Sequence, residues 1–143
     1  GYTVQSSRYD EPSQWSDNPA KPLERRMLRA PDHYGYIALS CAPFRNAQAT
    51  LNGTYTGELL VPHIRPDNNF DELVKTRDFW DMGIKLSYDI RLNGTATIQL
   101  SCGVKNIFDQ LQNDLDVGAD KDAGFIYGPA LPRTFFFGVK FTL

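Results

Sequence analysis

The chain has 143 residues, a formal net charge of -2 and a pI near 5.6, so it lacks the basic field that attracts nucleic acid, and we expect no nucleic-acid partner. Hydrophobic residues make up 41% of the chain and aromatic residues 13%, which fits a sheet with two unlike faces better than a globule with one deep core. No stretch approaches the roughly 18 apolar residues of a membrane helix, but a barrel strand needs only about 10 alternating residues.

The first half of the chain carries three runs in which apolar and polar residues alternate weakly. Residues 2–8 form the faintest run, and residues 34–42 and 47–56 form the other two. Each run is predicted to be a strand. In the second run, three apolar residues fall on one face: Ile37, Leu39 and Cys41. Because the chain opens directly on such a run, without an initiator Met or a leader, we expect it to be part of a longer protein.

The clearest pattern covers residues 79–90, where small or polar residues alternate with apolar ones: Trp80, Met82, Ile84, Leu86, Tyr88 and Ile90. Alternation of this length predicts a strand with one apolar and one polar face. A second such run covers residues 96–108. Asn93-Gly94 between the two runs is a strong signal for a hairpin.

The alternation also predicts the register of this hairpin. Residues opposite each other in antiparallel strands share a face, so an even-numbered apolar face in both strands requires pairs whose numbers sum to an even value. A three-residue loop over 92–94, with a left-handed glycine at its end, meets that condition. It would place Arg91 opposite Thr95. It would also place Asp81 opposite Lys105 on the polar face.

The last residues, 134–143, repeat the pattern with apolar residues at odd positions: Phe135, Phe137, Val139, Phe141 and Leu143. No run of comparable length shows helical periodicity. The predicted fold class is therefore all-β, with about six antiparallel up-and-down strands.

The predicted connections alternate between long loops (9–33, 57–78 and 109–133) and tight turns (43–46 and 91–95). In an up-and-down sheet the long loops then share one end, as in outer-membrane barrels with short periplasmic turns and long extracellular loops. Unpaired strand edges are not tolerated in hydrocarbon, so we expect residues 1–143 to be the last part of a larger barrel in the outer membrane of a Gram-negative bacterium. Four aromatic residues near the loop end would join its interfacial girdle: Tyr34, Tyr55, Phe79 and Trp80.

The two cysteines, Cys41 and Cys102, fall in strands that two other strands separate. This separation is roughly 14 Å at about 4.8 Å per strand. It exceeds the limit of about 7 Å for a disulfide. We therefore expect two free thiols on the apolar face.

The end of the chain carries three motifs: Gly103-Val-Lys-Asn-Ile-Phe-Asp109, Tyr127-Gly-Pro129 and Pro132-Arg-Thr-Phe-Phe-Phe-Gly138. Together with Glu24 to Tyr36, they resemble the C-terminal barrel of TonB-dependent outer-membrane receptors. The resemblance implies a barrel of about 22 strands around a plug, with the plug and the TonB-contacting box outside this chain. Gly138-x-x-Phe141-x-Leu143 is similar to the terminal signal read by the barrel-assembly machinery, although the family often ends in Phe.

The same resemblance implies a function and a set of partners. The protein would bind and import a scarce extracellular solute, a ferric siderophore or cobalamin-like complex in preference to an oligosaccharide. Its partners would be outer-membrane lipid, the plug and remaining strands, the TonB complex and the barrel-assembly machinery. Position in the long loops and side-chain chemistry select six substrate-binding candidates: Trp15, Arg29, His63, Asp116, Tyr127 and Arg133. The rival interpretation is a secreted, soluble β-sandwich that binds a ligand and buries the apolar faces between two sheets.

Catalytic and metal-binding motifs are weak in this sequence. The loop 114–122 is rich in Asp, but its spacing differs from that of a calcium loop, so a solvated loop is favoured over a calcium site. His33 and His63 have no cysteine at zinc-ligand spacing. No nucleophile elbow or metalloprotease motif is present. We therefore predict neither an enzyme nor a cofactor.

Overall fold

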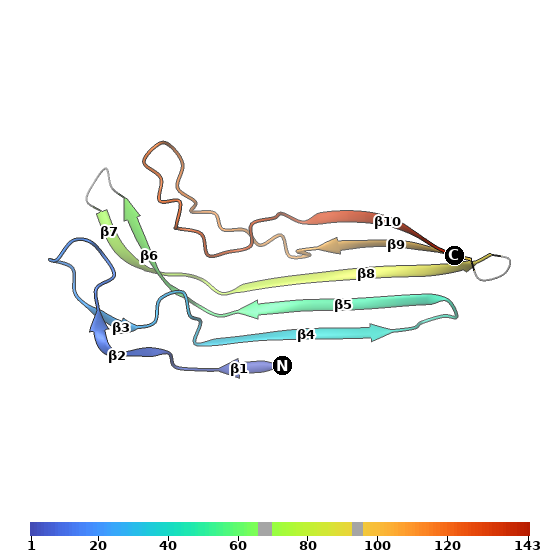
Figure 1. The fold of residues 1–143 in the computed structure, drawn as a ribbon, viewed down its shortest axis with the longest axis horizontal. Helices are drawn as coiled ribbons and strands as arrows, with labels where there is room; N and C mark the ends of the chain where they lie inside the picture. Colours follow the sequence, from blue (N-terminus) through green and yellow to red (C-terminus); the bar gives the residue numbers. More distant parts are fainter. Residues whose placement is uncertain (66–69, 93–95) are drawn as a thin grey trace.

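The computed structural model describes residues 1–65, 70–92 and 96–143, and the regular elements in these ranges are all β-strands. The fold class is all-β, as predicted. The main sheet has six strands, ordered as they follow one another along the chain (Figure 1): β1 (Tyr2–Val4), β4 (His33–Cys41), β5 (Ala47–Thr56), β8 (Phe79–Arg91), β9 (Thr97–Lys105) and β10 (Thr134–Thr142). Every neighbouring pair is antiparallel, which confirms the up-and-down arrangement. Over these ranges, no helix has the length and apolar character needed to cross a membrane.

Two of the predicted long loops contain short strands that the alternation did not reveal. β2 (Arg8–Ser13) pairs with β3 (Glu24–Arg26), and β6 (Leu60–Arg65) pairs with β7 (Phe70–Lys75). The expectation of irregular loops over 9–33 and 57–78 is therefore wrong in these segments. Both hairpins contain a proline, a residue that breaks the strand pattern, and β2 is exposed along its whole length. The first strand is also shorter than the predicted run 2–8.

The two small sheets and the segment that follows β9 lie at one end of the main sheet (Figure 1). The connections from β4 to β5 and from β8 to β9 lie at the opposite end, together with the C-terminus. Long connections and tight turns are thus segregated, as the alternation of their lengths predicted.

The register aligns most apolar residues of the main sheet on one side. One row runs across five strands through Cys41, Ala49, Leu86, Cys102 and Phe137. We call this side the apolar face; it carries the odd positions of β4, β5 and β10 and the even positions of β1, β8 and β9. It holds no Asp, Glu, Lys or Arg in any of the six strands, all of which lie in the described ranges. Both cysteines are free thiols on this face, with two strands between them, as predicted.

The opposite side, which we call the polar face, collects the alternate positions of the same strands. Thr, Ser, Asn and Gln predominate there, and its charged residues are Asp81, Lys85, Asp89, Arg91, Lys105 and Lys140. Tyr34 and Phe79 also lie on this face, whereas Tyr55 and Trp80 lie on the apolar face. Only the latter pair can therefore join an outer aromatic girdle, and the expectation for Tyr34 and Phe79 is wrong. The reason is parity: neighbouring residues in a strand point to opposite sides.

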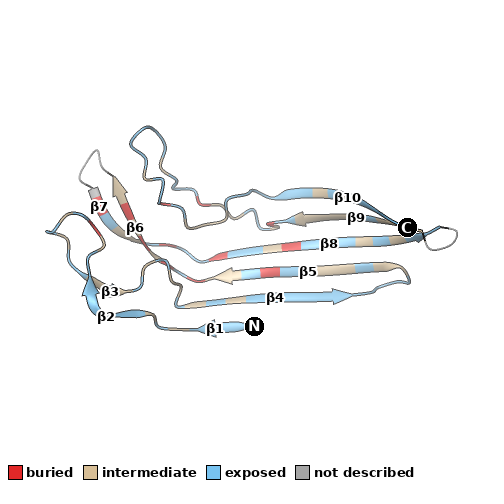
Figure 2. Ribbon diagram, in the orientation of Figure 1, coloured by how far each residue is buried: buried red, intermediate tan, exposed pale blue. Residues whose placement is uncertain are grey.

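Neither face of the main sheet is covered by a second layer. On the apolar face, Phe137 of the edge strand β10 is 89% exposed, and Leu86 of the inner strand β8 is still 50% exposed. The chain exposes 9880 Å², against about 7,500 Å² for a compact monomer of this mass. The buried apolar residues lie instead at the loop end (Figure 2): Leu59, Val61, Phe79 and Phe125.

The register of the β8–β9 hairpin keeps the predicted parity but differs from the predicted pairs. Arg91 pairs with Thr97 rather than with Thr95, a shift of two residues that leaves every side chain on its expected face. The N–H of Leu92 donates to the carbonyl of Ala96 at 2.9 Å, which adds a bond to the ladder. Asp81 and Lys105 share the polar face, as expected, but are not opposite each other. The prediction of a left-handed Gly94 concerns a residue outside the described ranges.

Candidate functional site

The described residues of the three long connections fold against one another into a single unit, which we call the loop assembly (9–33, 57–65, 70–78 and 106–133). Its core consists of Leu59, Val61 and Phe125, with Val74 and Tyr127 packed against it. β6 presents Val61 and His63 to this core because they are alternate residues of one strand. On β7, the residues opposite them are Val74 and Glu72. Apolar burial therefore joins segments that are far apart in the sequence.

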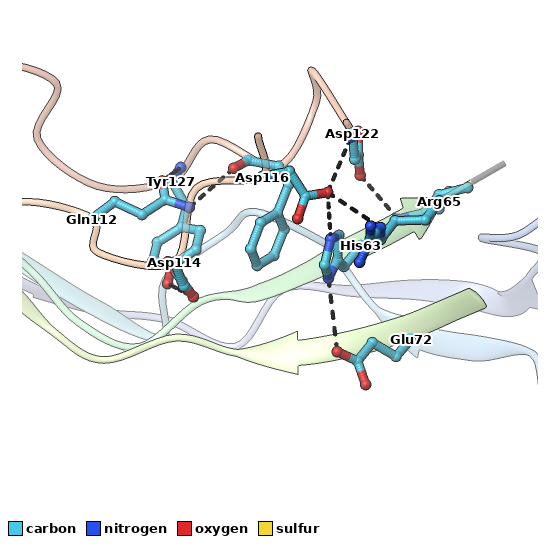
Figure 3. A network of polar contacts seen from close by, with 10 residues as sticks. His63, Arg65, Glu72, Gln112, Asp114, Asp116, Asp122 and Tyr127 are labelled. Carbon is cyan, nitrogen blue, oxygen red and sulfur yellow. Dashed lines mark hydrogen bonds and ion pairs between the residues drawn. The ribbon is translucent and has the colours of Figure 1, made fainter. Parts of the chain in front are cut away.

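His63 forms the polar contact at the edge of this core (Figure 3). Its Nε2 lies 2.8 Å from Oδ2 of Asp116, and its Nδ1 lies 3.7 Å from Oε1 of Glu72. The imidazole ring stacks on Phe125 with 4.0 Å between the ring centroids and 17° between the planes. The ring thus has carboxylates on two sides and an aromatic face on a third. The side chains of His63 and Asp116 are only 11% and 13% exposed, so their contact is largely shielded from bulk water, whereas Glu72 is half exposed.

Asp116 receives several favourable contacts in its ionised form. The hydrogen bond with His63 is the largest cause that lowers the pKa of the Asp116 carboxyl below its usual value, followed by the bond donated by the N–H of Asp122. The charges of His63 and Arg65 lower the pKa further, while burial opposes them. The Nε of Arg65 lies 3.9 Å from Oδ2 of Asp116. The ionised carboxylate of Asp116 therefore links β6 to the third long connection.

Asp122 adds a second link between the same two segments. Its Oδ2 accepts the backbone N–H of Ile64 at 2.9 Å, and its Oδ1 accepts the N–H of Gly124 at 2.7 Å. The β6 edge is thus capped by a side chain rather than by another strand. This contact satisfies a backbone donor that would otherwise face the loop.

The buried side chain of Gln112 hydrogen-bonds the backbone on both sides of the Phe125–Tyr127 segment. It is 7% exposed, its Nε2 donates to the carbonyl of Phe125 at 3.0 Å, and its Oε1 accepts the N–H of Tyr127 at 2.9 Å. The Tyr127 hydroxyl donates to Oδ2 of Asp114 at 2.5 Å. Burial and this bond to a carboxylate raise the pKa of Tyr127 to about 12. Tyr127 is therefore a neutral hydrogen-bond donor at physiological pH.

The first long connection is attached to the other two at separate points. The guanidinium of Arg29 donates to the carbonyls of Gly124 at 2.6 Å and Ile126 at 3.2 Å, while its backbone N–H donates to the carbonyl of Leu60 at 2.9 Å. Arg29 has a φ of 60°. Elsewhere in the assembly, the buried Ser16 hydroxyl donates to the buried carboxylate of Asp71.

The base of the third connection is closed by two residues of the motif that ends β9. Asn106 is 3% exposed, and its Nδ2 donates to the carbonyls of Gln110 and Leu131, both at 2.9 Å. Oδ1 of Asp109 accepts the backbone N–H of Arg133 at 2.7 Å. The φ angles of the two residues are 47° and 52°, a conformation that Asn and Asp adopt more readily than most residues. The start and the end of the connection are thus held together.

The third connection bends over the loop end of the polar face. Phe79, which is 4% exposed at the start of β8, lies with its ring centroid 5.8 Å from that of Tyr127. A hollow of about 190 Å³ lies beneath, with these lining residues: Thr54, Thr56, Phe79, Asp81, Tyr127, Gly128 and Pro129. The connection therefore lies over the loop end of the polar face only, and the rest of that face remains uncovered.

The structure brings together four of the six predicted substrate-binding residues. Arg29, His63, Asp116 and Tyr127 all belong to the loop assembly and contact the segment 112–126 or lie within it. Trp15 lies in the first connection of the assembly, where its indole N–H donates to the carbonyl of Pro22 at 2.9 Å. Arg133 lies at the base of the connection, where its backbone N–H meets Asp109.

Three residues that organise this site are not among the predicted substrate-binding residues: Gln112, Phe125 and Asp122. Phe125 and Gln112 stand in an irregular segment without periodicity, so no pattern predicts their burial. For the base of the third connection the sequence did carry a signal, because the residue types of Asn106 and Asp109 favour the positive φ angles that they adopt there. Across the described part of the chain, no cluster of three or more His, Cys, Asp or Glu residues is arranged to hold a metal ion.

Comparison with known proteins gives no match to a family model, to a curated protein or to a solved structure.

Proposed function

We propose that this chain forms part of the wall and the extracellular loops of an outer-membrane β-barrel receptor that imports a scarce solute with energy from a TonB complex. The solute class proposed is a ferric siderophore or a cobalamin-like complex, ahead of an oligosaccharide. No catalytic role is proposed. The lipid of the outer membrane, the remaining strands with their plug, and the barrel-assembly machinery are the corresponding partners.

The observation that carries the proposal is the uncovered apolar face of the main sheet. It extends over six strands, lacks Asp, Glu, Lys and Arg, and exposes large residues such as Phe135 at 73% and Leu39 at 56%. Soluble monomers rarely expose apolar patches larger than a few hundred Å². Strands with an apolar outer side and a polar inner side are typical of membrane barrels. A β-sandwich would need a second sheet on this face, and the described strands place none there.

The free edges of the sheet support the same assignment. β1 and β10 are the outer strands and have no further neighbour among the described strands. An open edge in hydrocarbon leaves backbone groups unpaired at a cost of several kcal/mol each. Additional strands of the same barrel would satisfy both edges. The loop assembly, which bends over the polar face, would then stand above the barrel interior.

The experiment that tests the proposal uses the free thiol of Cys102. In a barrel, Cys102 faces acyl chains, so a water-soluble maleimide should not label it in intact outer membranes of a Cys41→Ser variant, because thiolates do not form in hydrocarbon. Unfolding in detergent should restore labelling. The matched control moves the thiol by one residue, to the polar face, in a Ser101→Cys variant that lacks both native cysteines.

Fractionation and gel migration complete this test. The protein that contains this chain should sediment with the outer membrane and should change its migration on heating, as closed barrels do. A protein in the soluble fraction, or rapid labelling of Cys102 by the water-soluble reagent, would contradict the proposal. Labelling of the polar-face control but not of Cys102 is the expected result.

A further inference from the structure

The polar face contains a second hollow below the one that the third connection covers. Its volume is about 320 Å³, and both hollows share Thr54 and Asp81. Its polar lining residues are Thr50, Asn52, Thr54, Asp81, Lys85 and Lys105. Gly83 lines it without a side chain, and the ring of Phe136, another lining residue, packs against Gly103, the residue opposite Lys85. The two hollows follow one another along the sheet, starting at the loop end.

The second hollow has excess positive charge. Lys85 and Lys105 line it together with a single carboxylate, Asp81. Neither lysine forms an ion pair with any residue that the structure describes. Lys105 has its Nζ 5.9 Å from the centroid of the Phe136 ring, a contact that positions an ammonium group without using its N–H donors. The hollow therefore has a charge of +1, whereas the whole chain has a charge of -2.

The neighbouring side chains are suited to oxygen-rich ligands. Thr50 lies opposite Lys85 in the register and Thr54 lies opposite Asp81, so hydroxyl groups flank the charged groups on the adjacent strand. Asn52 adds an amide. Lysine ammonium groups form strong charge-assisted hydrogen bonds with carboxylates and phosphates. Asp81 and the threonine hydroxyls can accept hydrogen bonds from hydroxyl groups of the same ligand.

We propose that Lys85 and Lys105 form an anion-binding site on the polar face, which takes a solute carrying carboxylate or phosphate groups as it leaves the loop assembly. The inference rests on the proposed function in one respect, namely that the polar face borders the import pathway. It narrows the solute class to anions. The evidence for the anion site is the charge and the hydroxyl groups of the hollow, and it does not depend on the contacts in the loop assembly.

Binding of two anionic probes tests this site. Equilibrium dialysis would use radiolabelled citrate and inorganic phosphate with the complete protein that contains this chain, purified in mild detergent, and sucrose as the uncharged comparison. Lys85→Gln and Lys105→Gln should each weaken binding of the preferred anion about tenfold, since each removes a hydrogen bond to a charged group. Lys140→Gln is the matched control because Lys140 lies on the same face outside the hollow. It should change the dissociation constant less than twofold.

The outcomes separate this site from the proposed function. Stronger binding of citrate assigns a carboxylate-bearing solute, and stronger binding of phosphate assigns a phosphate-bearing one. Absence of saturable anion binding, equal binding of sucrose, or an equal loss in Lys140→Gln would overturn the site. The same preparation is checked for heat-modifiable migration and outer-membrane origin. A soluble protein with lysine-dependent anion binding would refute the barrel alone, and a membrane barrel without such binding would refute the anion site alone.

Discussion

The Nε2 atom of His63 lies 2.8 Å from Oδ2 of Asp116, and this contact joins β6 to a segment that follows it by 53 residues. The contact lies beside the stacked rings of His63 and Phe125. It links two of the three long connections at the point where their apolar core ends. The loop assembly therefore behaves as one unit, and its stability depends on a carboxylate and on an aromatic residue that can be changed separately.

Asp116→Asn should alter how the loop assembly responds to acid. Because the folded pKa of Asp116 is lowered, its stabilising contribution is complete above the ordinary Asp pKa of about 3.9 and is lost as the pH falls through the lowered pKa. Pepsin cleavage within 112–126 should therefore increase below about pH 4 in the wild-type protein. In Asp116→Asn, cleavage should already be increased at pH 5 and should depend less on pH. Asn113→Ala, at an exposed neighbouring site, is the control. Identical pH profiles for Asp116→Asn and the wild type would refute this role.

Phe125→Ala should loosen the loop assembly without affecting the main sheet. Phe125 is 2% exposed against Leu59 and Val61, and truncating a buried Phe to Ala costs about 3–5 kcal/mol. Hydrogen exchange should become faster in β6 and β7 but remain unchanged in β5 and β8. Val117→Ala, in the same connection but at an 87% exposed residue, should have little effect. Exchange that increases equally in β5 and β8 would show that the assembly and the sheet unfold together.

Val139→Arg should reduce the amount of protein in the outer membrane. Val139 lies on the apolar face and is 75% exposed, and an Arg near the bilayer midplane costs about 2–4 kcal/mol. Lys140→Gln, one residue further along on the polar face, should leave the amount unchanged. Quantitative fractionation of the two variants is the measurement. Equal abundance would be evidence against a lipid-facing strand and would favour the soluble sandwich.

Replacement of residues 111–130 by a short glycine-containing turn should separate assembly from uptake. The β9–β10 ladder ends before this segment, and closing a shorter loop changes the entropy only slightly, so the barrel should insert normally. Uptake of the cognate solute should be largely lost, because four of the candidate residues lie in this segment or contact it. Surface abundance and uptake are measured on the same cells. Full uptake at normal abundance would move the binding site to 9–33, to 57–78 or to the plug.

The sequence by itself predicted the strands of the main sheet, apart from the length of the first, together with their order and the side taken by the alternating apolar residues. The reason is local: a side-chain period of two in segments such as 79–90 and 134–143 specifies both the strand and its apolar side. Parity, however, permits registers that differ by two residues, so the pairing of Arg91 with Thr97 followed only from the assembled ladder. Tertiary structure also decided the hairpins β2–β3 and β6–β7, whose short and interrupted strands have no clear period.

The candidate site was determined only in part by the sequence. Position in a long connection was enough to select His63, Asp116, Arg29 and Tyr127, but not to predict that they meet. Their meeting depends on the burial of Phe125 against Leu59 and Val61, a contact between irregular segments that no local pattern encodes. The hydrophobic effect has no preferred direction and depends only on the apolar area removed from water. The sequence pattern therefore does not specify which distant apolar residues pack together, and only the folded chain does.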